Sequence, residues 1–209
     1  MTTKTVHEIY YDLTDEQWDE YERLWEEYEK EQEKAGEDKG LNKALLEGGL
    51  YRRYLSNQMI PKTIKLADEI IKNGEKVVIA CCYDEEIYTL KEHYGDIAVL
   101  FNGKCSLKQK DAAVDAFMND DNIKVFLGNI ASAGVGITLI SACKLIFNDV
   151  SYVPSDNEQM SDRIARIGQT KPVDIYYQIF RDTQYERMWN IVLRKTAIID
   201  AVIKKEDDK

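Results

Sequence analysis

The sequence predicts an α/β fold in which helices cover both faces of a parallel sheet. From residue 76 onward, short apolar segments alternate with longer segments of helical periodicity. The apolar segments run without polar interruptions, which is typical of strands buried on both faces. Regular alternation of strands and helices favours parallel strands that are joined by helical crossovers. A chain of 209 residues suffices for one such domain and an appendage.

The N-terminal segment is predicted to be mainly helical. Residues 4–11 are expected to form a short extended piece. A capping-box pattern, Thr14 followed by Gln17, opens a long helix that continues to about Lys34. Apolar residues recur along this helix as one stripe: Trp18, Tyr21, Leu24, Trp25 and Tyr28. The stripe predicts a surface helix docked on the chain, or alternatively a helix that recruits a partner.

Two further helical segments lead to the sheet. Residues 41–56 are expected to form the first. Pro61 suits the first turn of the second, which ends at the stop signal Asn73-Gly74. These boundaries predict a connector and helical extension over residues 1–60, followed by a compact lobe over residues 61–209.

The sheet is expected to form from the apolar segments in chain order. The predicted strands are Val77–Cys82, Ile97–Phe101, Ile123–Leu127, Cys143–Phe147 and Val173–Phe180. The predicted helices between and after them are Asp84–His93, Leu107–Met118, residues 155–169 and Thr183–Ile203. A glycine-containing loop follows the third of these strands. Ligands of such sheets gather beyond the carboxyl ends of the strands, so this loop is a candidate binding element.

The segment 159–169 carries the strongest functional signal. On a helix, Gln159, Arg163 and Arg166 would share one face, because they are spaced i, i+4 and i+7. A neighbouring face would be apolar and would pack inward: Met160, Ile164 and Ile167. Two guanidinium groups held in this way suit phosphate oxygens. From spacing alone, a solvated helix face is the favoured interpretation, and only the wider context of the sequence favours the phosphate-binding one.

The start of this predicted helix has its own signal. Pro154 precedes Ser155, and Glu158 follows three residues after Ser155, which is a capping-box pattern. The sequence therefore predicts a helix that begins near Ser155 and carries both arginines.

Charge and composition exclude several classes of protein. The net charge is −10, but fourteen acidic and only three basic residues lie between positions 8 and 38. The rest of the chain is close to neutral and shows no dense basic patch, so any grip on DNA by this chain alone should be weak. The uncharged stretch Val125–Cys143 contains too many polar residues and glycines to span a membrane. No secretory signal is expected, because no apolar run follows the first residues.

The four cysteines do not form a CxxC pair, and the chain has only two histidines. No metal site is therefore predicted. The cysteines are expected to be free thiols, which indicates a reducing compartment. This compartment is expected to be the cytoplasm, or whichever part of the cell holds the DNA.

The residues from Gln159 to Gln169, which end in Arg-Ile-Gly-Gln, closely resemble motif VI of the superfamily-two helicases. This variant looks like that of the Swi/Snf-related, helicase-like ATPases that translocate on double-stranded DNA. The resemblance implies a RecA-like lobe in which Arg163 and Arg166 are catalytic arginine fingers at the terminal phosphates of ATP. Gln159 belongs to the same ATP-binding motif. Arginine fingers stabilise the charge on the phosphoryl group in transfer.

The loop 128–139 resembles motif V of the same family. The resemblance implies that its first part, with Asn129 and Ser132, touches the DNA backbone. It also implies that Gly134 and Gly136 lie near the nucleotide. Small residues let backbone amides approach a phosphate closely. Many relatives carry a basic residue where Ala131 stands, so one expected phosphate contact is missing.

The segment Leu100–Lys104 resembles the region after motif IV of the family. The resemblance implies DNA-backbone contacts by Asn102, Gly103 and Lys104. For Lys104, a plain surface turn is the alternative.

Two parts of a complete phosphoryl-transfer site are not found in the sequence. There is no G-x-x-x-x-G-K-[ST] loop, and no apolar strand ends in an Asp-Glu pair that would hold magnesium. In the resembled family both parts belong to the first of two lobes. The chain is therefore expected to be the second motor lobe of a DNA translocase or helicase, cut from a longer protein or encoded separately.

The resemblance also implies what this lobe works with. ATP with Mg²⁺ would be held mainly by an N-terminal ATPase lobe, in cis or in trans. The partner would be DNA, in double-stranded form, and this chain alone would be inactive. The alternative is a non-catalytic module on the same fold that binds nucleic acid or protein.

Overall fold

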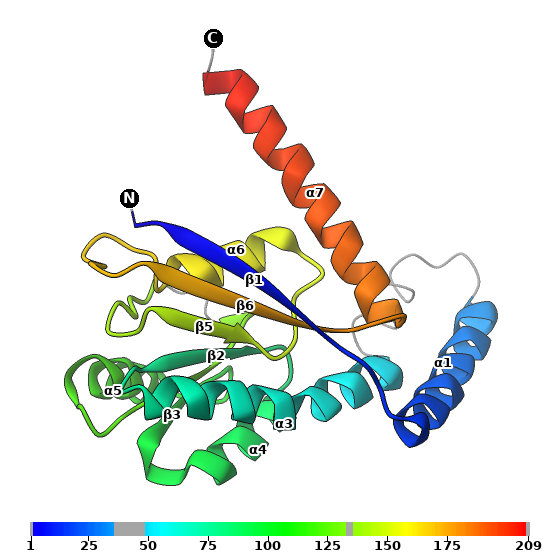
Figure 1. The fold of residues 1–209 in the computed structure, drawn as a ribbon, viewed down its shortest axis with the longest axis horizontal. Coiled ribbons are helices and arrows are strands. Elements are labelled where there is room, and N and C mark those ends of the chain that lie inside the picture. The colour runs from blue at the N-terminus through cyan, green and yellow to red at the C-terminus, as the bar shows by residue number, and fades with distance from the viewer. Residues whose placement is uncertain (1, 36–48, 133–135, 208–209) are drawn as a thin grey trace.

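The structure is a computed structural model that describes residues 2–35, 49–132 and 136–207. Its centre is a parallel sheet of six strands in the order β1-β6-β5-β2-β4-β3 (Figure 1). The strands are β1 (Lys4–Tyr11), β2 (Val77–Cys81), β3 (Ala98–Phe101), β4 (Val125–Asn129), β5 (Lys144–Phe147) and β6 (Val173–Phe180). The predicted α/β fold with a parallel sheet is confirmed.

Helices cover the sheet on both faces. The helices in the described residues are α1 (Asp15–Ala35), which packs on α3, and α3 (Leu50–Lys72), α4 (Asp84–Tyr94), α5 (Leu107–Asn119), α6 (Pro154–Asp162) and α7 (Gln184–Asp207), with a short 3-10 turn at Gly95–Ile97. Alternate residues of β2 face opposite sides. Val78 and Ala80 join one buried cluster with side chains of α5, α6 and α7. Val77, Ile79 and Cys81 join another with α3 and α4.

The first strand has a larger part in the fold than its sequence indicates. All eight residues of β1 pair with β6 in parallel register, from Lys4 opposite Val173 to Tyr11 opposite Phe180. The segment expected as a mere extended piece is therefore one edge of the sheet. The predicted boundary between residues 60 and 61 lies within α3, and the division into two parts stays a prediction.

Helix α3 corrects the expected helix start at Pro61. The helix begins at Leu50 and runs through Pro61 to Lys72 without interruption. Pro61 is on the exposed side, where a carbonyl that loses its N–H partner can turn to water. Buried residues on either side of it, among them Met59 and Ala67, pack inward. Tertiary packing therefore continues the helix past the proline. Half of the predicted segment 41–56, residues 41 to 48, lies outside the described residues.

The capping box that opens α1 is confirmed. Gln17 N donates to Thr14 Oγ1 at 3.3 Å, and Thr14 N donates to Gln17 Oε1 at 3.0 Å. The aromatic stripe of α1 packs against the Tyr51 ring of α3, with the centroid of Trp25 5.0 Å and that of Tyr28 5.1 Å away. The docked form of this helix is therefore the correct interpretation, because its stripe is used within the chain.

None of the helices in the described part of the chain is long and apolar enough to cross a membrane. All four cysteines are free thiols. Across the same described residues, the His, Cys, Asp and Glu side chains nowhere gather into a group that could hold a metal ion.

Candidate nucleotide and DNA interfaces

The segment with the two arginines does not form the predicted helix. Helix α6 ends at Asp162, and Arg163 and Arg166 lie in the turns that follow. In a longer helix, the carbonyl groups of residues 163 and 164 would accept bonds from the next turn. Instead, Leu139 N donates to Arg163 O at 2.8 Å, and Gln169 Nε2 donates to Ile164 O at 3.1 Å. These bonds, one from the glycine-containing loop and one from the side chain of Gln169, replace helical ones, and the helix ends.

The expected faces of this helix are corrected as a consequence. Met160 and Ile164 are buried as predicted, but the side chain of Ile167 is 99% exposed. The predicted capping box at Ser155 is also wrong. Val153 caps the helix and Pro154 fills its first turn, where no N–H bond is needed.

The two arginines line a common hollow of about 930 Å³. Its other walls include Thr2 and Thr3, which precede β1, and Lys171 and Pro172, which precede β6. The hollow therefore lies beside the amino ends of these two strands. The loop prediction placed ligands at the opposite, carboxyl ends, so the two groups of candidate residues lie at opposite ends of the strands.

Two backbone carbonyls and one side-chain hydroxyl of the glycine-containing loop hold the Arg166 guanidinium. Its Nη1 donates to Ile137 O at 3.1 Å and to Gly136 O and Thr138 Oγ1 at 3.3 Å each. Burial and the neighbouring charge of Arg166 lower the pKa of Arg163, with Asp162 opposing them. Two like charges that disfavour each other in this way create a local preference for an anion.

The remaining predicted nucleotide residues are dispersed. Gly136 is exposed, and a side chain at this position would meet nothing within 4 Å. Gly134 lies outside the described residues. Gln159 is exposed on α6 and does not line the hollow. The structure therefore brings together Arg163, Arg166 and the end of the loop, while the role of Gln159 stays a prediction.

Gln169 is a positioning residue that sequence reasoning missed. Its Nε2 donates to the carbonyl oxygens of Ile140 (3.2 Å), Ala142 (2.8 Å) and Ile164 (3.1 Å). One amide therefore ties the end of the glycine-containing loop to the arginine segment. No spacing rule reveals this, because all three acceptors are backbone groups.

The residues predicted to contact DNA lie at the carboxyl ends of the strands. Gly103, Lys104, Asn129 and Ser132 line a second hollow of about 450 Å³ at the carboxyl ends of β2, β3 and β4. Asn102, in contrast, is fully buried. Its Oδ1 accepts from Lys104 N at 3.1 Å, and its Nδ2 donates to Asp84 Oδ1 at 3.2 Å. This burial places Asn102 as a support for the turn.

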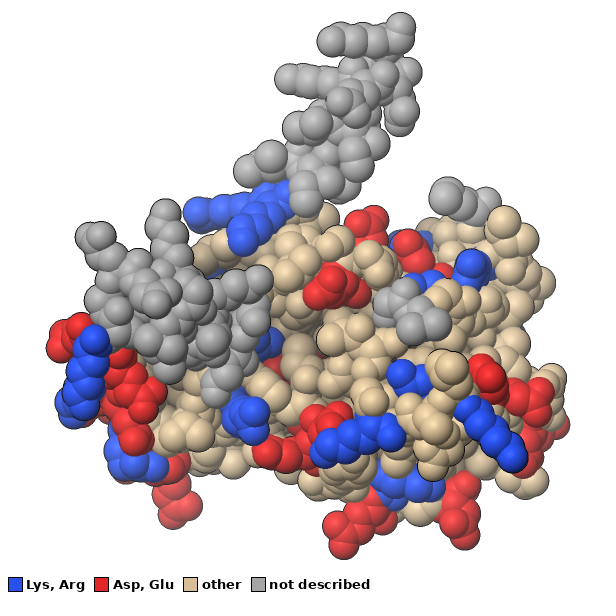
Figure 2. Space-filling view, turned by 180° about the vertical axis from the view of Figure 1, so that it is seen from behind, with Lys and Arg blue, Asp and Glu red and all other residues tan. Residues whose placement is uncertain are grey.

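Asn129 and Ser132 shape the start of the loop. Asn129 Nδ2 donates to Cys82 O at 3.0 Å, and Ser132 N donates to Asn129 Oδ1 at 3.2 Å. Lys104 Nζ lies 3.2 Å from Asp84 Oδ2, so the lysine predicted to contact DNA faces a carboxylate. On the face that Figure 2 shows, basic and acidic side chains are interspersed, and no continuous basic surface is visible there among the described residues.

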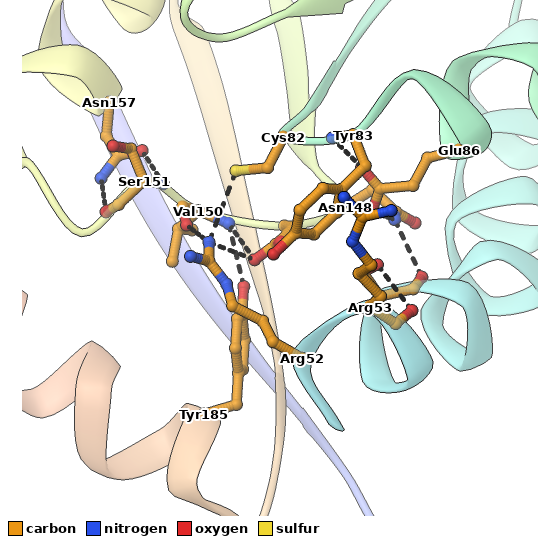
Figure 3. A network of polar contacts seen from close by, with 12 residues as sticks. Arg52, Arg53, Cys82, Tyr83, Glu86, Asn148, Val150, Ser151, Asn157 and Tyr185 are labelled. Carbon is orange, nitrogen blue, oxygen red and sulfur yellow. Dashed lines mark hydrogen bonds and ion pairs between the residues drawn. The ribbon is translucent and has the colours of Figure 1, made fainter. Parts of the chain in front are cut away.

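A buried ion pair lies near the carboxyl ends of these strands. Arg52 of α3 is 4% exposed, and its Nη2 lies 3.2 Å from Asp149 Oδ1 (Figure 3). The same guanidinium donates to Val150 O. Burial is the largest single effect and lowers the pKa of Arg52, but Asp149 together with the neighbouring Cys82, Tyr83 and Tyr185 outweighs it, so the pKa of Arg52 is raised well above its ordinary value. The pair links α3 to the loop that leads into α6.

A chain of neutral and acidic side chains continues from this ion pair. Asn148 Nδ2 donates to Glu86 Oε1 at 2.7 Å, and Thr63 Oγ1 donates to Asn148 Oδ1 at 2.6 Å. Tyr83 N donates to Glu86 Oε2 at 2.9 Å. Burial, followed by the charge of Asp149, raises the pKa of Glu86 well above its ordinary value, although the hydrogen bonds from Tyr83 and Asn148 oppose the shift.

The Glu86 shift predicts how stability depends on pH. Its folded-state pKa is raised above the unfolded-state value of about 4.3. The stabilising contribution is therefore complete below that value and is lost as the pH rises toward the folded-state pKa. We expect the free energy of unfolding of the natural chain to fall, relative to that of Glu86→Gln, between about pH 5 and pH 8.

Urea unfolding of both proteins at several pH values measures this difference. Glu85→Gln is the matched control, because Glu85 is the preceding residue in the chain and its side chain is 60% exposed. It should leave the pH dependence unchanged. Parallel curves for the natural chain and Glu86→Gln would contradict the prediction.

Sequence and structure comparisons with known proteins identify the family of this chain. The family model described as "Helicase conserved C-terminal domain" matches residues 61–168, about half of the chain. The chain belongs to this family. The matched residues of this helicase C-terminal domain include the glycine-containing loop, Lys104 and both arginines.

Curated relatives agree with this assignment. The chain is 35% identical over 117 residues to the SWI/SNF-related matrix-associated actin-dependent regulator of chromatin subfamily A-like protein 1 homolog of Caenorhabditis elegans. It is 30% identical over 142 residues to ATP-dependent helicase fft3 of Schizosaccharomyces pombe. The matches cover 56% and 66% of this chain but only 17% and 15% of those relatives.

The Sulfolobus solfataricus SWI2/SNF2 ATPase core in complex with dsDNA has the same fold. Its TM-score is 0.72 at 21% identity, over 98% of the present chain and 47% of that chain. The expected resemblance to the C-terminal, RecA-like lobe of Swi/Snf-related helicases is therefore confirmed.

Proposed function

We propose that this chain is the second motor lobe of an ATP-dependent DNA translocase or helicase. In this role Arg163 and Arg166 reach the terminal phosphates of an ATP molecule bound between two lobes. The residues around the smaller hollow contact the DNA backbone. Closure of the two lobes around ATP then shifts the grip on DNA in each cycle.

The geometry around Arg166 carries the proposal. Its guanidinium is exposed on the rim of the larger hollow, yet three acceptors of the glycine-containing loop fix its position. A guanidinium that is held and exposed at once suits a role toward a phosphate from outside the chain, since preorganised charge needs no rearrangement at the moment of reaction. The charges of Arg163 and Arg166 lie close enough to disfavour each other, which supports an anion beside this pair.

A first lobe is needed for the rest of the chemistry. The sequence holds no phosphate-binding G-x-x-x-x-G-K-[ST] loop. ATP and Mg²⁺ would therefore be held mainly by an N-terminal ATPase lobe, in cis or in trans. The S. pombe relative, named an ATP-dependent helicase, supports nucleotide use, and the archaeal core of which this chain covers 47% supports a second part of similar size.

The isolated chain should hydrolyse no ATP. The reason is that the arginines complete a phosphoryl-transfer site but do not bind the nucleotide and metal by themselves. A steady-state phosphate-release assay with duplex DNA measures this. Addition of a first lobe from the same protein should start turnover, and that addition is the positive control. Turnover by the isolated chain at ordinary motor rates would show that the site is complete in this chain, against the proposal.

Two observations support binding of DNA. The archaeal ATPase core that shares this fold is in complex with dsDNA, and the predicted contact residues Gly103, Lys104, Asn129 and Ser132 line the smaller hollow together. The net charge of −10 predicts that this chain binds DNA weakly when alone. The alternative, a non-catalytic binding module, gains no support from the aromatic stripe of α1, because that stripe packs on α3.

A further inference from the structure

Two basic side chains from separate elements line the smaller hollow. Arg53 comes from the start of α3, and Lys104 comes from the turn after β3. Each pairs with one of two consecutive acidic residues in the first turn of α4. Arg53 Nη1 lies 3.1 Å from Glu85 Oε1, and Lys104 Nζ lies 3.2 Å from Asp84 Oδ2. No pattern in the amino-acid sequence singles out Arg53.

Each of these cations also lies against an aromatic ring. The guanidinium carbon of Arg53 is 5.0 Å from the ring centroid of Tyr83, and Lys104 Nζ is 5.3 Å from that of Tyr88. An aromatic face attracts a cation without neutralising its charge. Both cations would therefore stay positioned at the hollow if their carboxylate partners were displaced.

The ion pairs are exposed, which makes them replaceable. The side chains of Arg53 and Lys104 are 42% and 70% exposed. Exposed ion pairs contribute little to stability and weaken further in salt. A phosphate diester offers the same anionic oxygens as a carboxylate, and the planar guanidinium fork of Arg53 suits it.

We propose that Arg53 is a further ligand for backbone phosphates of DNA, beside Lys104, in this hollow. Asp84 and Glu85 occupy the two cations when DNA is absent, and phosphates displace them. The acidic pair thereby lowers the affinity for DNA. This inference rests on the proposed DNA-binding function. It adds Arg53 as a DNA ligand and the acidic pair as a competitor that lowers the affinity for DNA.

Titration of a fluorescent duplex with this chain tests the proposal, with anisotropy recorded at several salt concentrations between about 50 and 200 mM. Arg53→Ala should weaken binding several-fold and reduce the slope of log affinity against log salt by about 0.9, the loss of one phosphate contact. Arg53→Lys should keep most of that slope. Glu85→Gln, which removes the competing carboxylate, should strengthen binding several-fold.

Arg23→Ala is the matched control. Arg23 lies on α1, outside the hollow, and forms a similar exposed pair with Glu20 at 2.7 Å. Its loss should leave affinity and slope unchanged. If the natural chain fails to bind duplex at the lowest salt, the DNA-binding part of the proposed function fails together with this inference. If the natural chain binds and Arg53→Ala binds with equal affinity and slope, only the inference fails. Unchanged DNA affinity of Glu85→Gln would contradict the claim that the acidic pair competes with DNA for the two cations.

Discussion

Replacement of Arg166 by alanine, in a protein that joins this chain to its first lobe, should lower ATP turnover by about 10³-fold or more. The expected cause is the loss of a positive charge at the phosphoryl group in transfer. Arg163→Ala should have an effect of similar size. DNA affinity should change little, because both arginines line the larger hollow and the predicted DNA contacts line the smaller one. Steady-state ATPase rates and duplex binding, measured on the same preparations, separate the two effects.

A matched control and a stability measurement complete this test. Arg181 is an exposed arginine that pairs with Asp12, so Arg181→Ala should retain normal turnover. The contacts of Arg166 are exposed, so its loss should change the free energy of unfolding by no more than about 0.5 kcal/mol. Normal turnover combined with a clear loss of stability in Arg163→Ala and Arg166→Ala would assign both residues a structural role only.

Replacement of Arg52 by alanine should lower the free energy of unfolding by about 3–5 kcal/mol, as expected when one partner of a buried ion pair is removed. Asp149 is fully buried and would be left as an uncompensated charge. The bond to Val150 O would also be lost. Urea unfolding monitored by far-UV circular dichroism measures the change.

Arg53→Ala provides the control for this prediction. Arg53 follows Arg52 directly in α3, but its pair with Glu85 is exposed, so its loss should cost no more than about 1 kcal/mol. Addition of Asp149→Asn to Arg52→Ala should recover part of the lost stability, because it removes the buried charge. An effect of Arg52→Ala as small as that of Arg53→Ala would mean that water or rearrangement relieves the charge of Asp149.

The strands are the most predictable part of the fold. The apolar pattern predicts a strand at Val77–Cys82, and β2 spans Val77–Cys81, because burial on both faces leaves a continuous apolar segment. The edge position of β1 could not be predicted in the same way. Its pairing with β6 joins Lys4 to Val173, and nothing local in either segment specifies that partner.

The arginine segment shows where periodicity misleads. Residues 159–169 have helical spacing, yet the helix ends at Asp162 because Leu139 N takes the carbonyl of Arg163. Residue types identify the segment, but a loop that precedes it in the chain sets its backbone. Asn102 is a related case, since an amide expected to contact DNA is buried as a support.

The connection from β4 to β5 runs from the carboxyl ends of the strands to their amino ends. Near its start, Ser132 lines the smaller hollow, and at its middle, Ile137 O accepts a hydrogen bond from Arg166. This one connection thus contributes a residue to each of the two candidate interfaces. In the proposed function, a movement at the nucleotide site could therefore be transmitted to the DNA contacts along this one connection, without a change in the strands.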